Sequence, residues 1–180
     1  MVTYHDEEWG VPVHDENALF ERLVLEGAQS GLSWALILSK RPAYRVLFRD
    51  FDPAVVARFD DDDVERLVLD ARIVRNRAKI VSAISNARVV VEMHGAGESL
   101  EELLWSFTGG KTHHNAWRSL DQLPSSSPAS EAMSAALRKR GFRFVGPTTC
   151  YATLQAAGMV NDHTVTCFRH AELAARAGRR

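Results

Sequence analysis

A glutamate, a tryptophan and the loop between them are the first residues of this chain that could do chemistry. Glu26 follows an apolar helical stretch, and a carboxylate in such a position is rarely buried unless it is paired or functional. Gly27 and Gly31 in the loop allow a ligand or a second backbone to approach closely. Trp34 begins the next apolar stretch, where an indole can line a pocket and stack on a planar ring. These residues indicate a pocket; the alternative is a solvated helix end beside a core tryptophan.

A histidine and a cysteine near the C-terminus have the spacing of metal ligands. His163 and Cys167 are four residues apart, which on a helix places an imidazole and a thiol on one face. His5, near the other end of the chain, is a candidate third ligand, and Asp162 and Asn161 could orient the imidazole. The alternative is a hydrogen-bonded histidine beside a buried free cysteine.

Positive charge gathers in two segments that are candidates for contact with phosphate. Their basic residues are Arg72, Arg75, Arg77 and Lys79 in the first segment, and Arg138, Lys139, Arg140 and Arg143 in the second. Residues 70–80 join two helical patterns, so a hairpin there could present N–H groups and cations to a phosphate. Its turn positions hold Arg72 and Ala78, where such hairpins usually have glycine. Both segments could equally be solvated helix ends.

The remaining histidine motifs are weaker indications of a functional site. The pairs His5-Asp6 and His14-Asp15 are compatible with a metal-dependent phosphohydrolase of the His-Asp type, but the further ligands that such a site needs are not evident. His113 and His114 follow two glycines, and we expect a solvated turn there.

Helical periodicity extends over nearly the whole chain and predicts an all-α fold. One example is the i, i+3, i+4, i+7 series Leu100, Leu103, Leu104 and Phe107. Helix starts are predicted at Asp52-Pro53, Ser99 and Ser127-Pro128, and a helix end at Gly141. We expect about eight or nine short helices in a single domain over residues 1–180, with Arg143–Val145 briefly extended.

Composition excludes several classes of protein. The 180 residues are 46% hydrophobic and carry 22 basic and 23 acidic side chains, which excludes a disordered chain and a globally basic one. Two cysteines cannot staple a fold of this size, so a reduced, cytoplasmic setting is expected. The sequence has no apolar run of membrane-spanning length and no signal-peptide pattern at its start, so we expect no membrane association.

Several blocks of sequence together resemble the 3-methyladenine DNA glycosylase I family of bacterial alkylation-repair enzymes. The resemblance covers essentially the whole chain, and blocks matched in the same order are more specific than any single motif. The blocks are Tyr4–Pro12, Leu25–Trp34, Phe51–Pro53, Asp63–Leu67, Leu104–Phe107, Lys139–Gly146 and Leu154–His163.

The resemblance implies a fold and a set of site residues. The fold would be a helix-hairpin-helix DNA glycosylase with a zinc-stapled lobe built from about residues 1–15 and 147–180. Glu26 would recognise the methylated adenine, with Tyr4 and Trp34 as pocket aromatics. His5, His163 and Cys167 would bind structural Zn²⁺. Gly31 and Leu32 would push into the base stack, while Arg72, Arg75, Arg77 and Lys79 would contact DNA.

The chain departs from the family pattern in two places. The family's fourth zinc ligand is a cysteine upstream of the position of His5, and a pocket tryptophan comes from the same upstream segment. We therefore expect three protein ligands or a weakened site, with His170 as a possible substitute ligand and Cys150 as a packing residue. The second departure is the glycine-poor hairpin at residues 70–80, where a non-glycine residue at positive φ would cost about 1 kcal/mol.

The activity implied is that of a monofunctional glycosylase that hydrolyses 3-methyladenine from alkylated double-stranded DNA and starts base excision repair. Free 3-methyladenine would be the product, and a monomer is expected. No lysine in the matched pocket segments is placed to form a Schiff base, so lyase activity is not expected. Two alternatives stay open: a non-catalytic helical module that binds DNA or senses damage, and the His-Asp phosphohydrolase.

Overall fold

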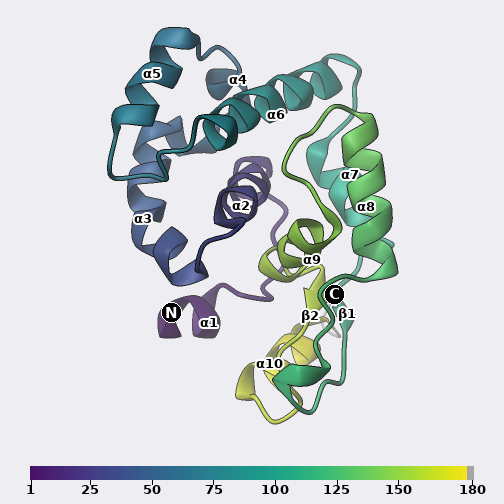
Figure 1. The fold of residues 1–180 in the computed structure, drawn as a ribbon. Coiled ribbons are helices and arrows are strands. Elements are labelled where there is room, and N and C mark those ends of the chain that lie inside the picture. The colour runs from purple at the N-terminus through teal and green to yellow at the C-terminus, as the bar shows by residue number, and fades with distance from the viewer. Residues whose placement is uncertain (178–180) are drawn as a thin grey trace.

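The computed structural model describes the backbone of residues 1–177 and the side chains of residues 1–175, so the last residues of the expected 147–180 lobe segment lie outside the described part. The described chain is mainly helical, as predicted (Figure 1). Its helices are α1 (Val2–Glu7), α2 (Glu16–Gln29), α3 (Trp34–Leu47), α4 (Pro53–Val56), α5 (Asp61–Leu69), α6 (Arg77–Gly95), α7 (Leu100–Ser106), α8 (Pro128–Lys139), α9 (Pro147–Ala156) and α10 (Phe168–Ala177). The described chain also contains two 3-10 turns, η1 (Arg49–Phe51) and η2 (Leu120–Gln122), and two strands, β1 (His113–His114) and β2 (Val160–Asn161). None of these helices combines the length and apolarity that a membrane crossing requires.

Local capping signals set the ends of several helices, and three predicted starts are confirmed. The Asp52 side chain accepts a hydrogen bond from the Ala54 N–H at the start of α4. Ser99 caps α7, and Ser127 caps α8 in a reciprocal capping box. Gly141 follows the end of α8 with φ of 94°, a left-handed conformation that glycine adopts without steric cost.

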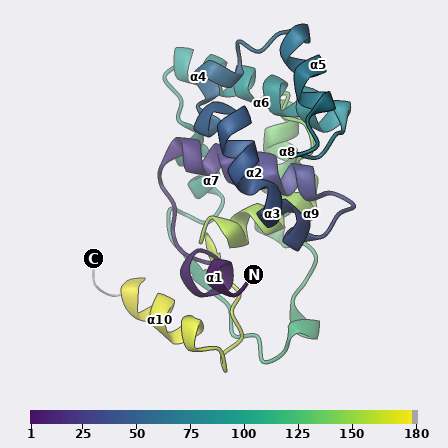
Figure 2. The same cartoon turned by 90° about the vertical axis from the view of Figure 1, so that its left-hand side faces the viewer.

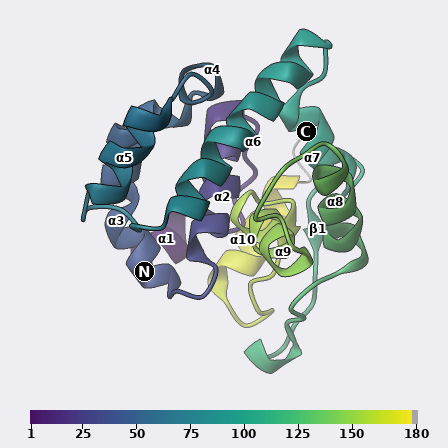
Figure 3. The ribbon, with the colours of Figure 1, turned by 45° about the horizontal axis from the view of Figure 1, so that its top comes forward.

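Helix α2 lies in the middle of the bundle. Figures 1 and 3 show α3 and α5 on one side of it and α8 and α9 on the other, while α6 runs across from the α5 side toward α7. Leu19, Phe20 and Leu23 of α2 are buried, and the Phe20 ring packs edge-to-face on Phe51 with ring centroids 6.5 Å apart. Full burial of such a side chain contributes about 1.5–3 kcal/mol, so α2 anchors the fold that presents Glu26 at its C-terminal end.

The two ends of the described chain lie at the same end of the molecule, where α1, α10 and both strands are found (Figures 1 and 2). β1 and β2 pair in parallel, with His113 opposite Val160 and His114 opposite Asn161. The prediction of a solvated turn at His113 and His114 was therefore wrong, although both residues are exposed. A strand of two residues is too short to show an alternating pattern in the sequence.

Two short connections between helices differ from the sequence expectation. No residue between α5 and α6 has positive φ, so the strained conformation expected at residues 70–80 is absent there. The connection between α8 and α9 contains Gly141 and Phe144, which has φ of 56°. The prediction of an extended Arg143–Val145 was wrong for this reason, because Phe144 is left-handed. The Asn86 side chain bonds to both the N–H and the carbonyl of Arg143 and so fixes this turn.

Candidate functional site

A pocket of about 390 Å³ opens between α1, the C-terminal end of α2, the start of α3 and α9. Tyr4, Glu26 and Trp34 line it, so the three pocket residues expected from the sequence do lie together. Gln155 of α9 also lines the pocket and was not anticipated, because nothing in its local sequence distinguishes it from other helical glutamines.

The two aromatic residues form one wall of the pocket. Their ring centroids are 5.4 Å apart and the planes are tilted by 57°. Burial and the nearby Glu26 raise the pKa of the Tyr4 hydroxyl, so it stays protonated at neutral pH. Trp34 is placed by the start of α3, where the Ser33 side chain accepts a hydrogen bond from the Leu36 N–H. The wall therefore offers ring faces and a hydroxyl to a planar ligand.

Glu26 is buried, with 6% of its surface exposed. Burial raises the pKa of its carboxyl group from 4.5 to about 8, and the positive charge of Arg22 opposes that shift in part. Among the described residues none donates a hydrogen bond to this carboxylate, and its oxygens are not sealed from solvent. A ligand in the pocket could therefore supply the missing donor or a positive charge.

The loop after α2 is held by two side chains. Gln29 Nε2 donates to the Leu32 carbonyl at 2.7 Å. Lys79 Nζ, from α6, donates to the carbonyls of Ala28 at 2.8 Å and Ser30 at 2.7 Å. Gly31, with φ of 77°, is exposed at the tip of the loop. Apart from its two chain neighbours, no described residue has an atom within 4 Å of where its Cβ would be. The ammonium group of Lys79 is therefore engaged in fastening this loop to α6.

The other basic residues of the first charged segment lie on the surface. Arg72 forms an ion pair with Asp70 at 2.6 Å, and the guanidinium lowers the pKa of that carboxyl to about 2. Arg77 pairs with Glu65 at 2.7 Å. Arg75 is exposed and forms no ion pair within the described part of the chain.

The second charged segment lies at the end of α8 and in the turn before α9. Arg138, Arg143 and Phe144 line a shallow cleft of about 470 Å³ there. Arg140 pairs with Glu98 at 2.8 Å, whereas Arg138 and Arg143 have no acidic partner among the side chains described. This surface therefore carries more uncompensated positive charge than the first segment.

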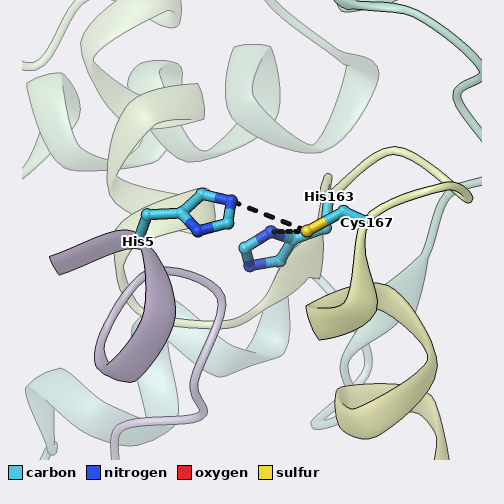
Figure 4. Close-up of side chains that lie close together, drawn as sticks. All are labelled: His5, His163 and Cys167. Atoms are coloured by element: carbon cyan, nitrogen blue, oxygen red, sulfur yellow. Dashed lines mark hydrogen bonds between the residues drawn. The ribbon is translucent and has the colours of Figure 1, made fainter. Parts of the chain in front are cut away.

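Figure 4 shows His5, His163 and Cys167 converging, as expected. Cys167 Sγ lies 3.6 Å from His5 Nε2 and 3.5 Å from His163 Nδ1, and the three candidate ligand atoms are within 4.8 Å of one another. The other ring nitrogen of each histidine has a partner: His5 Nδ1 bonds to Asp6 at 2.7 Å, and His163 Nε2 bonds to the Trp9 carbonyl at 3.0 Å. Such partners fix the ring orientation of metal-binding histidines.

The route by which these residues meet differs from the prediction. His163 and Cys167 lie in the turn before α10 and not on one helix face. The three residues after His163 are Thr164, Val165 and Thr166, whose β-branched side chains disfavour helix. The turn closes through a hydrogen bond from the Cys167 N–H to the Thr164 carbonyl, which brings the two ligands together.

The expected supporting residues also lie elsewhere. Asp162 does not orient the His163 ring; it accepts hydrogen bonds from other side chains, Gln155 among them. Asn161 accepts a hydrogen bond from the backbone N–H of His163. His170 bonds to the Asn115 carbonyl at 2.7 Å and lies outside the triad.

Cys150 and the pair His14-Asp15 lie outside the triad. Cys150 is fully buried, as expected of a packing residue, and burial raises the pKa of its thiol to about 12. His14 bonds to Glu101 and Asp15 caps α2, so this His-Asp pair does not join the triad. The arrangement does not support a His-Asp phosphohydrolase site.

A buried ion-pair network ties the N-terminal helix to the bundle. Arg41 of α3 donates from Nε to Glu21 at 2.5 Å and from Nη1 to Glu8 at 2.6 Å. Arg45 also donates to Glu21, at 3.0 Å. Glu8 directly follows α1, so the network holds the helix that carries Tyr4. Sequence reasoning missed it, because no local pattern pairs residues 20 and 33 positions apart.

The chain is similar to known proteins along most of its length. A family model described as methyladenine glycosylase matches residues 1–170. The chain is 49% identical to DNA-3-methyladenine glycosylase 1 of Escherichia coli K12, over 92% of this chain and 89% of that protein. It is 50% identical to a crystal structure of 3-methyladenine DNA glycosylase I, with a TM-score of 0.91 over 93% of this chain and 92% of the other. A Staphylococcus aureus 3-methyladenine DNA glycosylase I, whose structure concerns 3-methyladenine recognition, is 34% identical with a TM-score of 0.89, over 93% and 89% of the two chains. This chain therefore belongs to the methyladenine glycosylase family.

Proposed function

We propose that this protein is a DNA glycosylase that hydrolyses the N-glycosidic bond of 3-methyladenine in alkylated DNA and so starts base excision repair. The observation that carries the proposal is the pocket in which Tyr4 and Trp34 lie beside Glu26, a buried carboxylate that receives no hydrogen bond from the described residues. The DNA-3-methyladenine glycosylase 1 of E. coli, which is 49% identical along most of both chains, supports the same activity.

The chemistry needs few groups from the protein. An N3-methylated adenine in DNA carries a positive charge, so its glycosidic bond is already weakened and the base leaves without protonation. Unstacking costs a few kcal/mol, and less for a damaged base. In the pocket the ring would stack on Trp34 and Tyr4, with a cation–π contribution. Glu26 would accept hydrogen bonds from the adenine edge and favour the cationic base over neutral adenine.

Water then attacks the sugar carbon, which makes the reaction a hydrolysis. No lysine lines the pocket in the described part of the chain, so a Schiff base and strand cleavage are not expected. Release of 3-methyladenine from methylated duplex DNA, measured by chromatography of the freed bases, tests the function. Tight binding of that DNA by folded protein without base release would instead favour a non-catalytic damage-sensing module.

DNA would lie along the face that carries the loop after α2 and the two basic segments. The exposed tip at Gly31 and the half-buried Leu32 would enter the base stack. Arg72, Arg75 and Arg77 would face phosphates beside it. We assign the helix-hairpin-helix element to α8, the turn at Gly141 and α9, and not to residues 70–80 as the sequence suggested. This turn contains the glycine that such hairpins use, and Arg138 and Arg143 beside it have no acidic partner among the described side chains.

The Lys79 contact leads to a test of its role. Lys79→Met should slow base release about 10-fold, because the loop loses its link to α6, while the salt dependence of DNA binding stays at the wild-type slope. Arg75→Gln, on the same segment, should reduce that slope by about one unit. Fluorescence anisotropy across a salt series measures both slopes. A reduced slope for Lys79→Met would show that Lys79 binds phosphate, as the sequence suggested.

The triad fits a structural zinc ion. A thiol and two imidazoles are typical zinc ligands, and each imidazole already has the outer hydrogen bond found at such sites. His5, His163 and Cys167 would hold the ion and join the two chain ends, and its chemistry there would be structural. No step of the reaction needs it.

Cys167→Ser should therefore lower both zinc content and thermal stability. If zinc exceeds its Kd a hundredfold, bound metal contributes about 3 kcal/mol. Its loss would lower the Tm of a chain of this size by roughly 5–10 °C. Mass spectrometry of the metal content and differential scanning fluorimetry, each with and without a chelator, check this. His94→Gln is the matched control outside the triad, and equal chelator sensitivity of both variants would contradict the assignment.

A further inference from the structure

Asp162 is a buried carboxylate that serves as a hub for neutral hydrogen-bond donors. Only 1% of the residue is exposed. Its Oδ2 accepts from Gln155 Nε2 at 2.7 Å and from the Tyr151 hydroxyl at 2.6 Å. Its Oδ1 accepts from Asn115 Nδ2 at 2.6 Å and Trp117 Nε1 at 2.7 Å. An ionised carboxylate only accepts hydrogen bonds, so every group that faces Asp162 must present a donor.

This rule determines which way the Gln155 side chain points. A glutamine amide has a donor, the Nε2 amino group, and an acceptor, the Oε1 oxygen. The Asp162 carboxylate binds the donor. Nε2 is thereby turned toward Asp162 and Oε1 away from it. Oε1 accepts no hydrogen bond from the described residues, yet it is not sealed from solvent. Because Gln155 lines the pocket, this acceptor is available to a ligand bound there.

We propose that Gln155 is a further base-contacting residue, and that its Oε1 accepts a hydrogen bond from the exocyclic amino group of the methylated adenine. Asp162 is the positioning residue that keeps the acceptor directed at the pocket. This inference rests on the proposed function and deepens it. With Glu26, the pocket then has two acceptors that suit a cationic base with an amino group.

The same arrangement determines specificity. A methylated guanine carries a carbonyl oxygen where adenine carries its amino group, so it would place an acceptor against Oε1. A site built to bond an N–H discriminates strongly against a ligand that lacks it, because its polar group is left without a partner. Gln155 should therefore contribute to the preference for 3-methyladenine over 3-methylguanine.

The test compares single-turnover release of the two bases from methylated duplex DNA. Gln155→Met keeps the length of the side chain and removes the acceptor, and should reduce release of 3-methyladenine about 10-fold relative to 3-methylguanine. Asp162→Asn should shift the ratio in the same direction, because an asparagine amide also lets the Gln155 amide turn around. Trp117→Phe removes a donor from the far oxygen of the same carboxylate and should leave the ratio unchanged.

A second measurement separates this inference from the proposed function. Free 3-methyladenine is titrated against wild type and Gln155→Met, with tryptophan fluorescence as the readout, and the variant should bind about 10-fold more weakly. If the wild type binds the base but releases none from DNA, the proposed function fails and this comparison still decides the role of Gln155. Equal affinity and an unchanged release ratio in the folded Gln155→Met variant would overturn the inference.

Discussion

Glu26→Gln is expected to reduce release of 3-methyladenine by at least about 100-fold while leaving a folded protein. Glutamine keeps the size and one acceptor of the side chain but cannot carry the negative charge that favours a cationic base. Because burial raises the pKa of Glu26 to about 8, its ionised fraction grows as the pH rises toward that value. Wild-type kcat/KM should therefore increase from about pH 6 through pH 8 and level off only above about pH 9, a rise that the variant lacks.

The same substitution should make the protein more stable. A carboxyl whose pKa is raised on folding from 4.5 to about 8 gives up stability as the pH rises through that window, because the unfolded chain releases its proton first. At pH 7 the difference corresponds to about 3 kcal/mol, and Glu26→Gln removes it. The gain should disappear near pH 4.5.

Urea denaturation of both proteins from pH 4.5 to 8 measures this pH dependence, and chromatography of released base measures activity. A variant that loses activity and stability together would show that Glu26 is structural and would remove it from the site. The variant is expected instead to lose activity and gain stability, a combination that is common when a ligand-binding residue is replaced.

The second large effect is expected at Arg41. Arg41→Met should lower the free energy of unfolding by about 3–5 kcal/mol, because Glu21 would be left buried with only the half-exposed Arg45 as a partner. Glu8 would lose its bond as well, so α1 would be held less firmly. Since α1 carries Tyr4, affinity for free 3-methyladenine should fall along with stability. Chemical denaturation and base titration measure the two effects.

Two further variants decide whether the lost charge is the cause. The double variant Arg41→Met with Glu21→Gln removes the orphaned carboxylate and should be more stable than Arg41→Met alone. Arg66→Met breaks the exposed ion pair with Asp63 and should cost at most about 1 kcal/mol. Equal losses for Arg41→Met and Arg66→Met would show that the network is not a buried, coupled one.

Features with local causes could be predicted from the sequence. The caps at Asp52, Ser99 and Ser127 depend on a side chain two or three residues from its backbone partner. The pocket position of Glu26 was indicated by an apolar helix face ending at a glycine. Each of these signals acts over only a few residues, and tertiary packing leaves the predicted feature unchanged.

Features that depend on distant partners could not be read from the sequence. The Arg41 network and the Asp162 hub join segments from different parts of the chain, and no local pattern marks them. The triad was expected correctly, but from a helical spacing that the structure does not contain. The resemblance to a family brought His5, His163 and Cys167 together; the turn that does so in this chain depends on its own hydrogen bonds.

The meeting of the two chain ends has a consequence for the order in which the enzyme is assembled. His5 and Cys167 are 162 positions apart, and the pocket takes Tyr4 from one end and Gln155 from near the other. Contacts at such separation carry a high loop-closure cost and cannot form before the chain between the two segments has been made. A chain still emerging from the ribosome contains Glu26 and Trp34 before it contains Gln155, so only part of the pocket is present. Base excision therefore requires both segments, and the pocket can be completed only after Gln155 has been synthesised.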